Sequence, residues 1–239
     1  MNDISRTRHV SEYDLKPKPS QVIEDTYYDT KERFLGEKRT TLRTRRMDDT
    51  LLLSTKSDFR RIAGDLIQRR EMEQPWSYNS IRVLARNLKL YIPIMSSSKF
   101  QSLPVSKVLG TMGLEVIQKR QTYRELRDIV IRDKVPVSIL AELAIDHVTY
   151  DFGDISVGLS EIEIEAKAAR SLSTVREIAD ALVSKYSPSL HQWFHGKFVT
   201  GLAIQKLLKT RAFHSSLVNG ELGPEAFRLI ERVIESRRF

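Results

Sequence analysis

Acidic residues recur at every second position near residue 160 of this 239-residue chain, a spacing that could hold a metal ion. The run Ser160-Glu161-Ile162-Glu163-Ile164-Glu165 has an isoleucine between successive acids. Because side chains two apart on a β-strand point to the same face, the three carboxylates would lie together and repel one another. A hard divalent cation such as Mg²⁺ or Mn²⁺ would relieve that repulsion without Cys or His ligands. The run therefore predicts a metal site, although a solvated strand face also explains any single run of this kind.

Basic residues show the same spacing elsewhere in the chain. Arg43 and Arg45 would share one strand face, as would Arg120 and Arg124. Guanidinium groups bind phosphate oxygens in a bidentate manner, so these pairs indicate a polyanion that carries its metal with it. Buried charges without partners are costly, so the interior that holds them should be hydrated, as in an open-ended β-barrel. Further charges expected on this interior face are Lys56, Arg69, Glu71, Glu73 and Asp146.

The composition is that of a globular protein with an excess of positive charge. Apolar residues make up 41% and charged residues 29% of the chain, and 39 Lys and Arg against 31 Asp and Glu leave a net charge of +8 that attracts anions. The absence of cysteine excludes disulfides, iron–sulfur clusters, thiolate zinc sites and cysteine nucleophiles. The chain has neither a glycine-rich phosphate-binding loop nor an apolar stretch of about 18 residues. We therefore expect a soluble, cytoplasmic protein in which side chains bind any phosphate.

The pattern of apolar residues predicts an α+β fold in which strands predominate. Runs rich in Val, Ile, Thr and Tyr, separated by short polar turns, indicate an antiparallel meander between about residues 21 and 75. A helical period appears in residues 78–92 and 172–186, and the pattern of residues 198–239 indicates two helices separated by residues 219–224. Further strands are expected at about residues 115–133, 138–150 and 155–167, with a short helix at 105–113.

Seven short motifs occur in an order that characterises a known family. They are Tyr27-Tyr28-Asp29-Thr30, Leu42-Arg43-Thr44-Arg45, Thr55-Lys56, Arg69-x-Glu71-x-Glu73, Arg120-x-x-Tyr123, Leu143-Ala144-Ile145-Asp146 and Glu161-Ile162-Glu163-Ile164-Glu165. In this order the chain resembles the CYTH domain of the triphosphate tunnel metalloenzymes over about residues 12–200. The resemblance implies an eight-stranded antiparallel β tunnel with flanking helices, which binds triphosphate substrates together with divalent metal. Residues 1–200 would form this CYTH-like domain and residues 201–239 a C-terminal helical extension.

The resemblance also implies roles for individual residues. The family's opening Glu-x-Glu-x-Lys strand has its counterpart in Glu12-Tyr13-Asp14-Leu15-Lys16, and Gln118 stands where the family more usually has a lysine. Asp146, Glu71 and Glu73 would be the catalytic carboxylates, and one of them, or a second metal, would orient the attacking water. The metal ligands would be Glu12, Asp14, Glu161 and Glu163. The substrate phosphates would bind Lys16, Arg43, Arg45, Lys56, Arg69, Arg120, Arg124 and Lys197.

The predicted function is divalent-metal-dependent hydrolysis of a small-molecule triphosphate, with Mg²⁺ or Mn²⁺ as cofactor. The substrate would be inorganic triphosphate or a nucleoside or thiamine triphosphate. One alternative is a class IV-type adenylyl cyclase, and another is a non-catalytic module that binds polyphosphate or nucleotide, which is favoured if Glu12 and Asp14 do not complete the metal site. Nucleic-acid binding is the most distant alternative. No membrane partner is expected, and a homodimer is compatible with the sequence.

Overall fold

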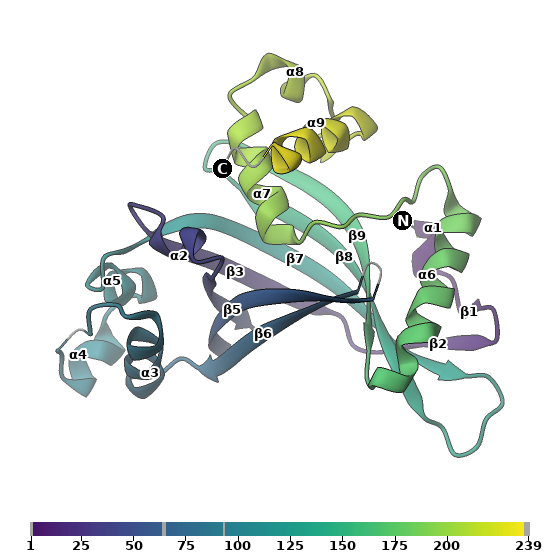
Figure 1. The fold of residues 1–239 in the computed structure, drawn as a ribbon, viewed down its shortest axis with the longest axis horizontal. Coiled ribbons are helices and arrows are strands. Elements are labelled where there is room, and N and C mark those ends of the chain that lie inside the picture. The colour runs from purple at the N-terminus through teal and green to yellow at the C-terminus, as the bar shows by residue number, and fades with distance from the viewer. Residues whose placement is uncertain (1, 64–65, 93, 237–239) are drawn as a thin grey trace. The chain divides into compact units, whose positions relative to one another are not determined.

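The computed structural model describes residues 2–63, 66–92 and 94–236, without the side chains of residues 2, 3 and 58–70. Strands and helices mix in an α+β fold, as predicted (Figure 1). The strands are β1 (His9–Val10), β2 (Tyr13–Pro17), β3 (Gln21–Thr30), β4 (Thr41–Met47), β5 (Thr50–Ala63), β6 (Leu66–Pro75), β7 (Leu114–Ile131), β8 (Ile139–Asp151), β9 (Ser156–Ala166), β10 (Leu217–Val218) and β11 (Glu221–Leu222). The helices are α1 (Asn2–Ser5), α2 (Phe34–Glu37), α3 (Tyr78–Leu88), α4 (Ser97–Ser102), α5 (Val105–Gly110), α6 (Leu172–Tyr186), α7 (Lys197–Leu207), α8 (Arg211–His214) and α9 (Pro224–Glu235), with a 3₁₀ turn at Ala169–Ser171.

The strands form one sheet whose order is β10-β11-β9-β8-β7-β3-β4-β5-β6, with β2 paired to β7 off this path and β1 paired to β2. The predicted α+β fold is confirmed, with differences in detail from the expected tunnel of eight antiparallel strands. Among the described residues the sheet has eleven strands, is not closed, and contains one parallel pair, β11 with β9. One edge of β9 is already occupied, since the N–H of Gly158 donates to the carbonyl of Gly220 at 2.9 Å. Gly158 permits this approach, because a side chain there would collide with the carboxylate of Glu221.

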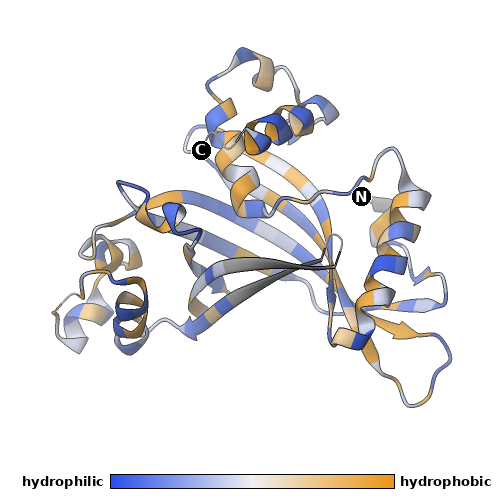
Figure 2. Cartoon of the chain, in the orientation of Figure 1, coloured by the Kyte–Doolittle hydropathy of each residue, from blue (hydrophilic) through white to orange (hydrophobic). Residues whose placement is uncertain are grey.

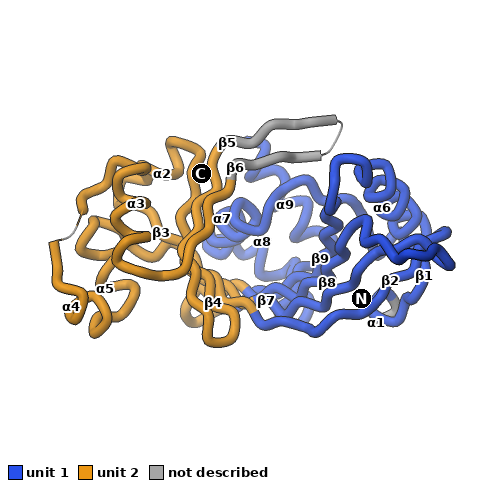
Figure 3. Tube along the Cα trace, turned by 90° about the horizontal axis from the view of Figure 1, so that it is seen from below, with its two compact units in different colours: residues 1–22, 122–149, 156–239 blue, residues 23–121, 150–155 orange. Residues whose placement is uncertain are grey.

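The chain divides into two compact units, each built from segments that are not contiguous in the sequence (Figure 3). Unit 1 comprises residues 1–22, 122–149 and 156–239, and unit 2 comprises residues 23–121 and 150–155. The long strand β7 contributes its first part to unit 2 and its second part to unit 1. Residues 201–239, the predicted C-terminal helical extension, belong to unit 1.

In unit 2, one face of the strands packs under helices and leaves the other face to charged residues. Tyr28, Leu42 and Leu53 come from three neighbouring strands and are buried in one core with Ile81 and Leu84 of α3. Ser77 is the N-cap of α3, and its hydroxyl accepts a hydrogen bond from the Ser80 amide. The helix ends at Leu88, earlier than predicted, because Lys89 has a left-handed φ of 56°. Residues 97–102 form the short helix α4, and the hydroxyl of Ser96 caps its N-terminus by accepting a hydrogen bond from the Lys99 amide.

In unit 1, the same alternation separates an apolar face from an ionic one. Leu143 and Ile145 of β8 are fully buried in a core with Ile178 of α6. Ile162 and Ile164 of β9 pack against this core, so the glutamates between them point to the opposite face. The alternation of hydrophilic and hydrophobic residues is visible as bands of colour along β7, β8 and β9 (Figure 2). Because side chains alternate along each strand, the acids of β8 and β9 lie next to one another on the face opposite the apolar core.

The C-terminal segment contains the two predicted helices, α7 and α9, and the short helix α8 and a hairpin between them. The turn of the hairpin is Asn219-Gly220, with φ values of 52° and 80°, which suits the primed turns that join short antiparallel strands. Pro224 begins α9, where its missing N–H costs nothing. Within the described part of the chain, no helix is long and apolar enough to cross a membrane.

Candidate functional site

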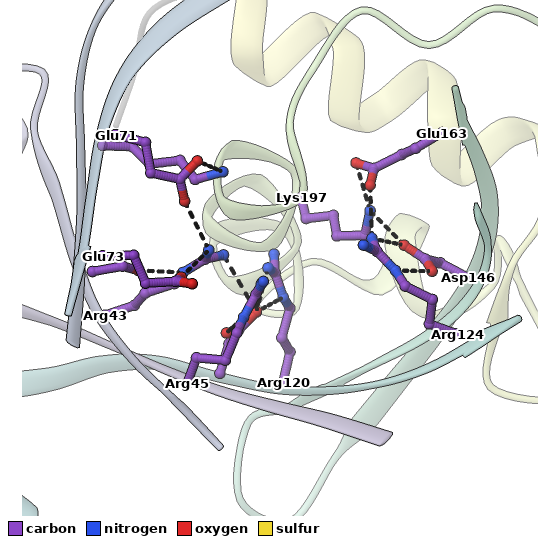
Figure 4. A network of polar contacts seen from close by, with 12 residues as sticks. Arg43, Arg45, Glu71, Glu73, Arg120, Arg124, Asp146, Glu163 and Lys197 are labelled. Carbon is purple, nitrogen blue, oxygen red and sulfur yellow. Dashed lines mark hydrogen bonds and ion pairs between the residues drawn. The ribbon is translucent and has the colours of Figure 1, made fainter. Parts of the chain in front are cut away.

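Three arginines of unit 2, Arg43, Arg45 and Arg120, lie close together (Figure 4). All three contact the buried carboxylate of Asp25, and we call these four residues the arginine cluster. Arg45 forms a bidentate pair with Asp25, with distances of 2.8 Å from Nε to Oδ1 and 2.9 Å from Nη2 to Oδ2. Arg120 donates to Oδ2 from Nη2 at 2.6 Å and from Nε at 3.2 Å. The third guanidinium, that of Arg43, lies 3.6 Å from the same Oδ2.

The strand pairing explains why these side chains meet. Arg43 and Arg45 alternate with Leu42 and Thr44 on β4, so they point away from the apolar core that contains Leu42. Asp25 lies directly opposite Arg45 in the register of β3 with β4. On the other side of β3 in the sheet is β7, which contributes Arg120. A central aspartate is thus reached by arginines from both neighbouring strands.

The predicted acids of β6 extend this network. Arg43 donates to Ser54 Oγ at 2.7 Å and to Glu71 Oε1 at 3.3 Å, and its Nη2 lies 3.9 Å from Glu73 Oε2. Lys56 lies 3.0 Å from Glu71 Oε2, its direct partner in the β5–β6 register. Glu71 and Glu73 are exposed, whereas Arg43 is buried. The basic side chains therefore form the inner part of the network and these acids its rim.

The arginines keep the carboxylate of Asp25 ionised. Burial alone would raise the pKa of Asp25, but the hydrogen bonds from Arg45 and the charges of Arg120 and Arg43 lower it well below its usual range. Arg120 is 5% exposed, and its guanidinium lies 5.2 Å from the centre of the Tyr27 ring. Among the described residues, its buried Nη1 has no hydrogen-bond partner. A buried cationic donor without a partner is costly, and an anionic ligand would satisfy it.

Three carboxylates of unit 1 form a second group, the carboxylate cluster: Asp146 of β8 with Glu161 and Glu163 of β9. One ligand oxygen from each of the three lies within 4.8 Å of the other two. Lys197, the first residue of α7, lies among them, with its Nζ 2.9 Å from Asp146 Oδ2, 2.8 Å from Glu163 Oε1 and in contact with Glu161 (Figure 4). Arg124 of β7 pairs with Asp146 at 2.7 and 2.6 Å and with Glu163 at 2.7 Å.

The carboxylate cluster carries more negative than positive charge, three acids against two basic side chains. Burial, together with the neighbouring carboxylates, raises the pKa of Glu161 despite the nearby ammonium group. The pKa of Lys197 is also raised, because the carboxylates outweigh the effect of burial and keep its ammonium protonated. A set of converging carboxylate oxygens is the donor set that Mg²⁺ and Mn²⁺ prefer. The three residues therefore fit a hard divalent cation.

Among the described residues, the first-strand residues Glu12, Asp14 and Lys16 are not part of either group. Asp14 instead contacts His9 at 2.7 Å and Arg132 at 3.1 Å, and Glu12 and Lys16 are exposed. The reason is the register, since Asp14 lies opposite Val130 of β7. Val130 is six residues beyond Arg124, a distance of about 20 Å along a strand. The apolar side chains of Tyr13 and Leu15, buried in the core of unit 1, hold β2 in this position.

The other predicted residues divide between the two groups. Arg43, Arg45, Lys56, Arg120, Glu71 and Glu73 lie in unit 2, whereas Arg124, Asp146, Glu161, Glu163 and Lys197 lie in unit 1. Arg69 belongs to β6, but the structure does not describe its side chain, so its predicted role stays a prediction. Sequence reasoning missed Asp25. Its spacing of two and four residues from Tyr27 and Asp29 was a signal, but Asp29 has a different role and accepts hydrogen bonds from the amides of Leu35 and Gly36.

A pocket in unit 2 lies apart from the charged residues. It is lined by Trp76, Tyr78, Phe100 and Leu103 together with three polar residues, Ser77, Ser97 and Gln101. The rings of Trp76 and Phe100 stack at 5.4 Å. None of the residues of the arginine cluster lines this pocket, so it contributes nothing to the candidate site.

Comparison with known proteins gives the family. The model of the CYTH domain matches residues 3–191. No curated protein matches the chain. A candidate adenylyl cyclase from Hippeastrum, described as having a dominant triphosphatase activity, is 16% identical with a TM-score of 0.47, covering 79% of this chain and 84% of that one. A protein of Pyrococcus horikoshii is 17% identical with a TM-score of 0.46, covering 82% and 89%. A candidate adenylate cyclase from Bacillus halodurans is 16% identical with a TM-score of 0.42, covering 78% and 94%.

These structural likenesses are too weak to carry an argument about activity, so the assignment rests on the domain match. That match covers most of the chain, including both the arginine cluster and the carboxylate cluster. The protein belongs to the CYTH family.

Proposed function

We propose that this protein is a divalent-metal-dependent triphosphatase whose arginine cluster binds phosphate oxygens and whose carboxylate cluster holds Mg²⁺ or Mn²⁺. The substrate is inorganic triphosphate or a nucleoside or thiamine triphosphate. One observation carries the proposal. Arg120 is buried among two further arginines with its Nη1 unsatisfied by any described residue, an arrangement that suits an anion with several oxygens.

Phosphoryl transfer depends mainly on positioning and charge stabilisation, and the side chains present suit both tasks. Asp146, Glu161 and Glu163 would hold the divalent ion, which neutralises charge on the phosphates when it is bound. Arg43, Arg45, Lys56 and Arg120, together with Arg69, would bind the remaining oxygens. We assign Arg124 and Lys197 to the carboxylate cluster, where both form ion pairs with the acids.

Glu71 and Glu73 remain the candidates for orienting the attacking water. Both are exposed at the rim of the arginine network, so water reaches them. The carboxylate of Glu71 lies between Lys56 at 3.0 Å and Arg43 at 3.3 Å, which keeps it close to the proposed phosphate ligands. An ionised carboxylate in this position can accept a proton from water.

The test is a phosphate-release assay with tripolyphosphate, ATP and thiamine triphosphate, each in Mg²⁺ and in Mn²⁺, with EDTA as the metal-free control. We expect release from at least one substrate, loss of release in EDTA, and loss in Arg43→Ala. Arg46→Ala is the matched control, because Arg46 is the exposed neighbour on the opposite side of β4. Formation of cyclic AMP from ATP instead of phosphate would identify the cyclase reaction.

A second candidate function is non-catalytic binding of polyphosphate or nucleotide. It is favoured by one specific observation, the displacement of Glu12 and Asp14 from the carboxylate cluster, which leaves that cluster without the ligands expected from the first strand. Tight binding of tripolyphosphate without phosphate release in either metal would establish this function and exclude the hydrolase.

A further inference from the structure

Among the residues whose side chains the structure describes, Asp25 is the acid that the arginine cluster encloses, and it is held by several hydrogen bonds. Its two carboxylate oxygens accept four hydrogen bonds, two from Arg45 and two from Arg120, at distances between 2.6 and 3.2 Å. The side chain is almost completely buried, with 2% of the residue exposed. A carboxylate in this position is inaccessible to solvent, and its hydrogen bonds are made to the surrounding guanidinium groups.

The position of β3 makes this arrangement possible. The strand lies between β7 and β4, so a side chain on its ionic face has one neighbour from each. Arg45 is its direct partner in the register, and Arg120 approaches from the other side. Both arginines bind Asp25 through Nε and Nη2, which directs the remaining Nη1 group of each away from it. For Arg120, that group is the one without a partner among the described residues.

Charge explains why an acid is needed there. The guanidinium groups of Arg43, Arg45 and Arg120 all lie within 3.6 Å of one carboxylate, and without it they would repel one another at short range. Arginine side chains are long and have many rotamers, so unrestrained they would separate. One carboxylate reduces the charge of the cluster from three to two and fixes two of the three guanidinium planes, so net positive charge remains for an anion.

We propose that Asp25 is a positioning residue, which orients Arg45 and Arg120 so that their free N–H groups point at the phosphates of the substrate. This inference rests on the proposed function, because it takes the arginine cluster to be the phosphate site. Asp25 itself does not contact the substrate. It acts through the two arginines, in the way that a second carboxylate commonly orients a ligand-binding side chain.

Binding of inorganic tripolyphosphate in EDTA, measured by calorimetry, separates positioning from turnover. Asp25→Asn preserves the size of the side chain but removes its charge and one acceptor. We expect its affinity to fall on the order of 10- to 100-fold, the range for losing hydrogen bonds to a charged group. Glu24→Gln is the matched control, because Glu24 is the preceding residue on β3 and is exposed, and its affinity should equal that of the wild type.

Asp25→Glu keeps the charge and moves the carboxylate by one methylene group, and it tests the proposal even where Asp25→Asn does not fold. Positioning predicts an affinity between those of the wild type and Asp25→Asn, with a normal melting temperature or a small decrease. Unchanged affinity in both folded variants would overturn the proposal and leave Asp25 a purely structural residue. Tighter binding in Asp25→Asn would also overturn it, because Asp25 would then compete with phosphate for the arginines. Failure of the wild type to bind tripolyphosphate would instead refute the proposed function, and with it this inference.

Discussion

The ammonium nitrogen of Lys197 lies 2.9 Å from Oδ2 of Asp146, at the centre of the three carboxylates that would hold a divalent cation. It also contacts Glu161 and Glu163. The ammonium group and a divalent ion would both be attracted to the same oxygens, and the space among those oxygens is limited to 4.8 Å between ligand atoms. In the proposed metal site, the ammonium group of Lys197 would therefore compete with the divalent ion for the same oxygens.

The first prediction follows from this competition. Lys197→Met removes the ammonium and keeps an unbranched side chain, so Mn²⁺ should bind more tightly than to the wild type, by about tenfold for each 1.4 kcal/mol of competition removed. Titration of Mn²⁺ followed by electron paramagnetic resonance measures the affinity directly. Lys209→Met, an exposed lysine after α7, is the control. Equal or weaker Mn²⁺ binding in Lys197→Met would show that the ammonium does not compete with the metal.

The second prediction concerns Glu163. Glu163→Gln removes a proposed metal ligand, so metal-dependent phosphate release should fall to background. The fold should survive, because the Glu163 side chain is 40% exposed and Asp146 keeps its bidentate partner Arg124. Circular dichroism checks the fold and a phosphate-release assay checks the activity. Glu165→Gln, two residues further along β9, should keep its activity, because Glu165 is not one of the three acids of the carboxylate cluster. Undiminished turnover in Glu163→Gln would refute the assigned role.

The third prediction tests the register of β2. The double variant with Glu12→Gln and Asp14→Asn should bind Mn²⁺ with wild-type affinity, because Asp14 lies opposite Val130 and contacts His9 and Arg132 instead of the metal ligands. Loss of these exposed contacts should change the free energy of unfolding only slightly, because solvent screens ion pairs at the surface. Calorimetry with Mn²⁺ and urea denaturation give the two quantities. A large fall in metal affinity would mean that β2 supplies ligands after all.

The fourth prediction is a dependence of stability on pH. The pKa of Asp25 is lower in the folded state than in the unfolded state, so the ionised carboxylate stabilises the fold above the unfolded value of about 3.9. That contribution is lost as the pH falls below this value toward the lower pKa of the folded state. Breaking a buried ion pair costs about 3–5 kcal/mol, which sets the expected gap in stability between the wild type and Asp25→Asn at neutral pH. Urea denaturation from pH 2.5 to pH 7 should show this gap shrinking below about pH 4. If the difference in stability between the wild type and Asp25→Asn instead widened as the pH fell, the prediction would be wrong.

Local pattern was sufficient to predict the ionic faces of the strands. A strand alternates its side chains strictly, so Glu161 and Glu163 had to share a face, with Ile162 turned to the other side. The same rule predicted that Arg43 and Arg45 lie together and that the charged faces lie opposite the apolar core. The family order of these motifs added the expectation of a triphosphate and a metal, and the domain match confirmed the family.

What the sequence determined by itself is therefore the chemistry available on each strand, because alternation is a property of the local backbone. The tertiary structure alone decided which of these groups meet. Asp25 and Arg120 are separated by 95 residues, and Lys197 reaches Asp146 and Glu161 only because α7 begins beside β8 and β9. The displacement of Glu12 and Asp14 and the pairing of β11 with β9 likewise depend on register and docking. Partners distant in the sequence are selected by the packing of whole elements, and no local pattern carries that information.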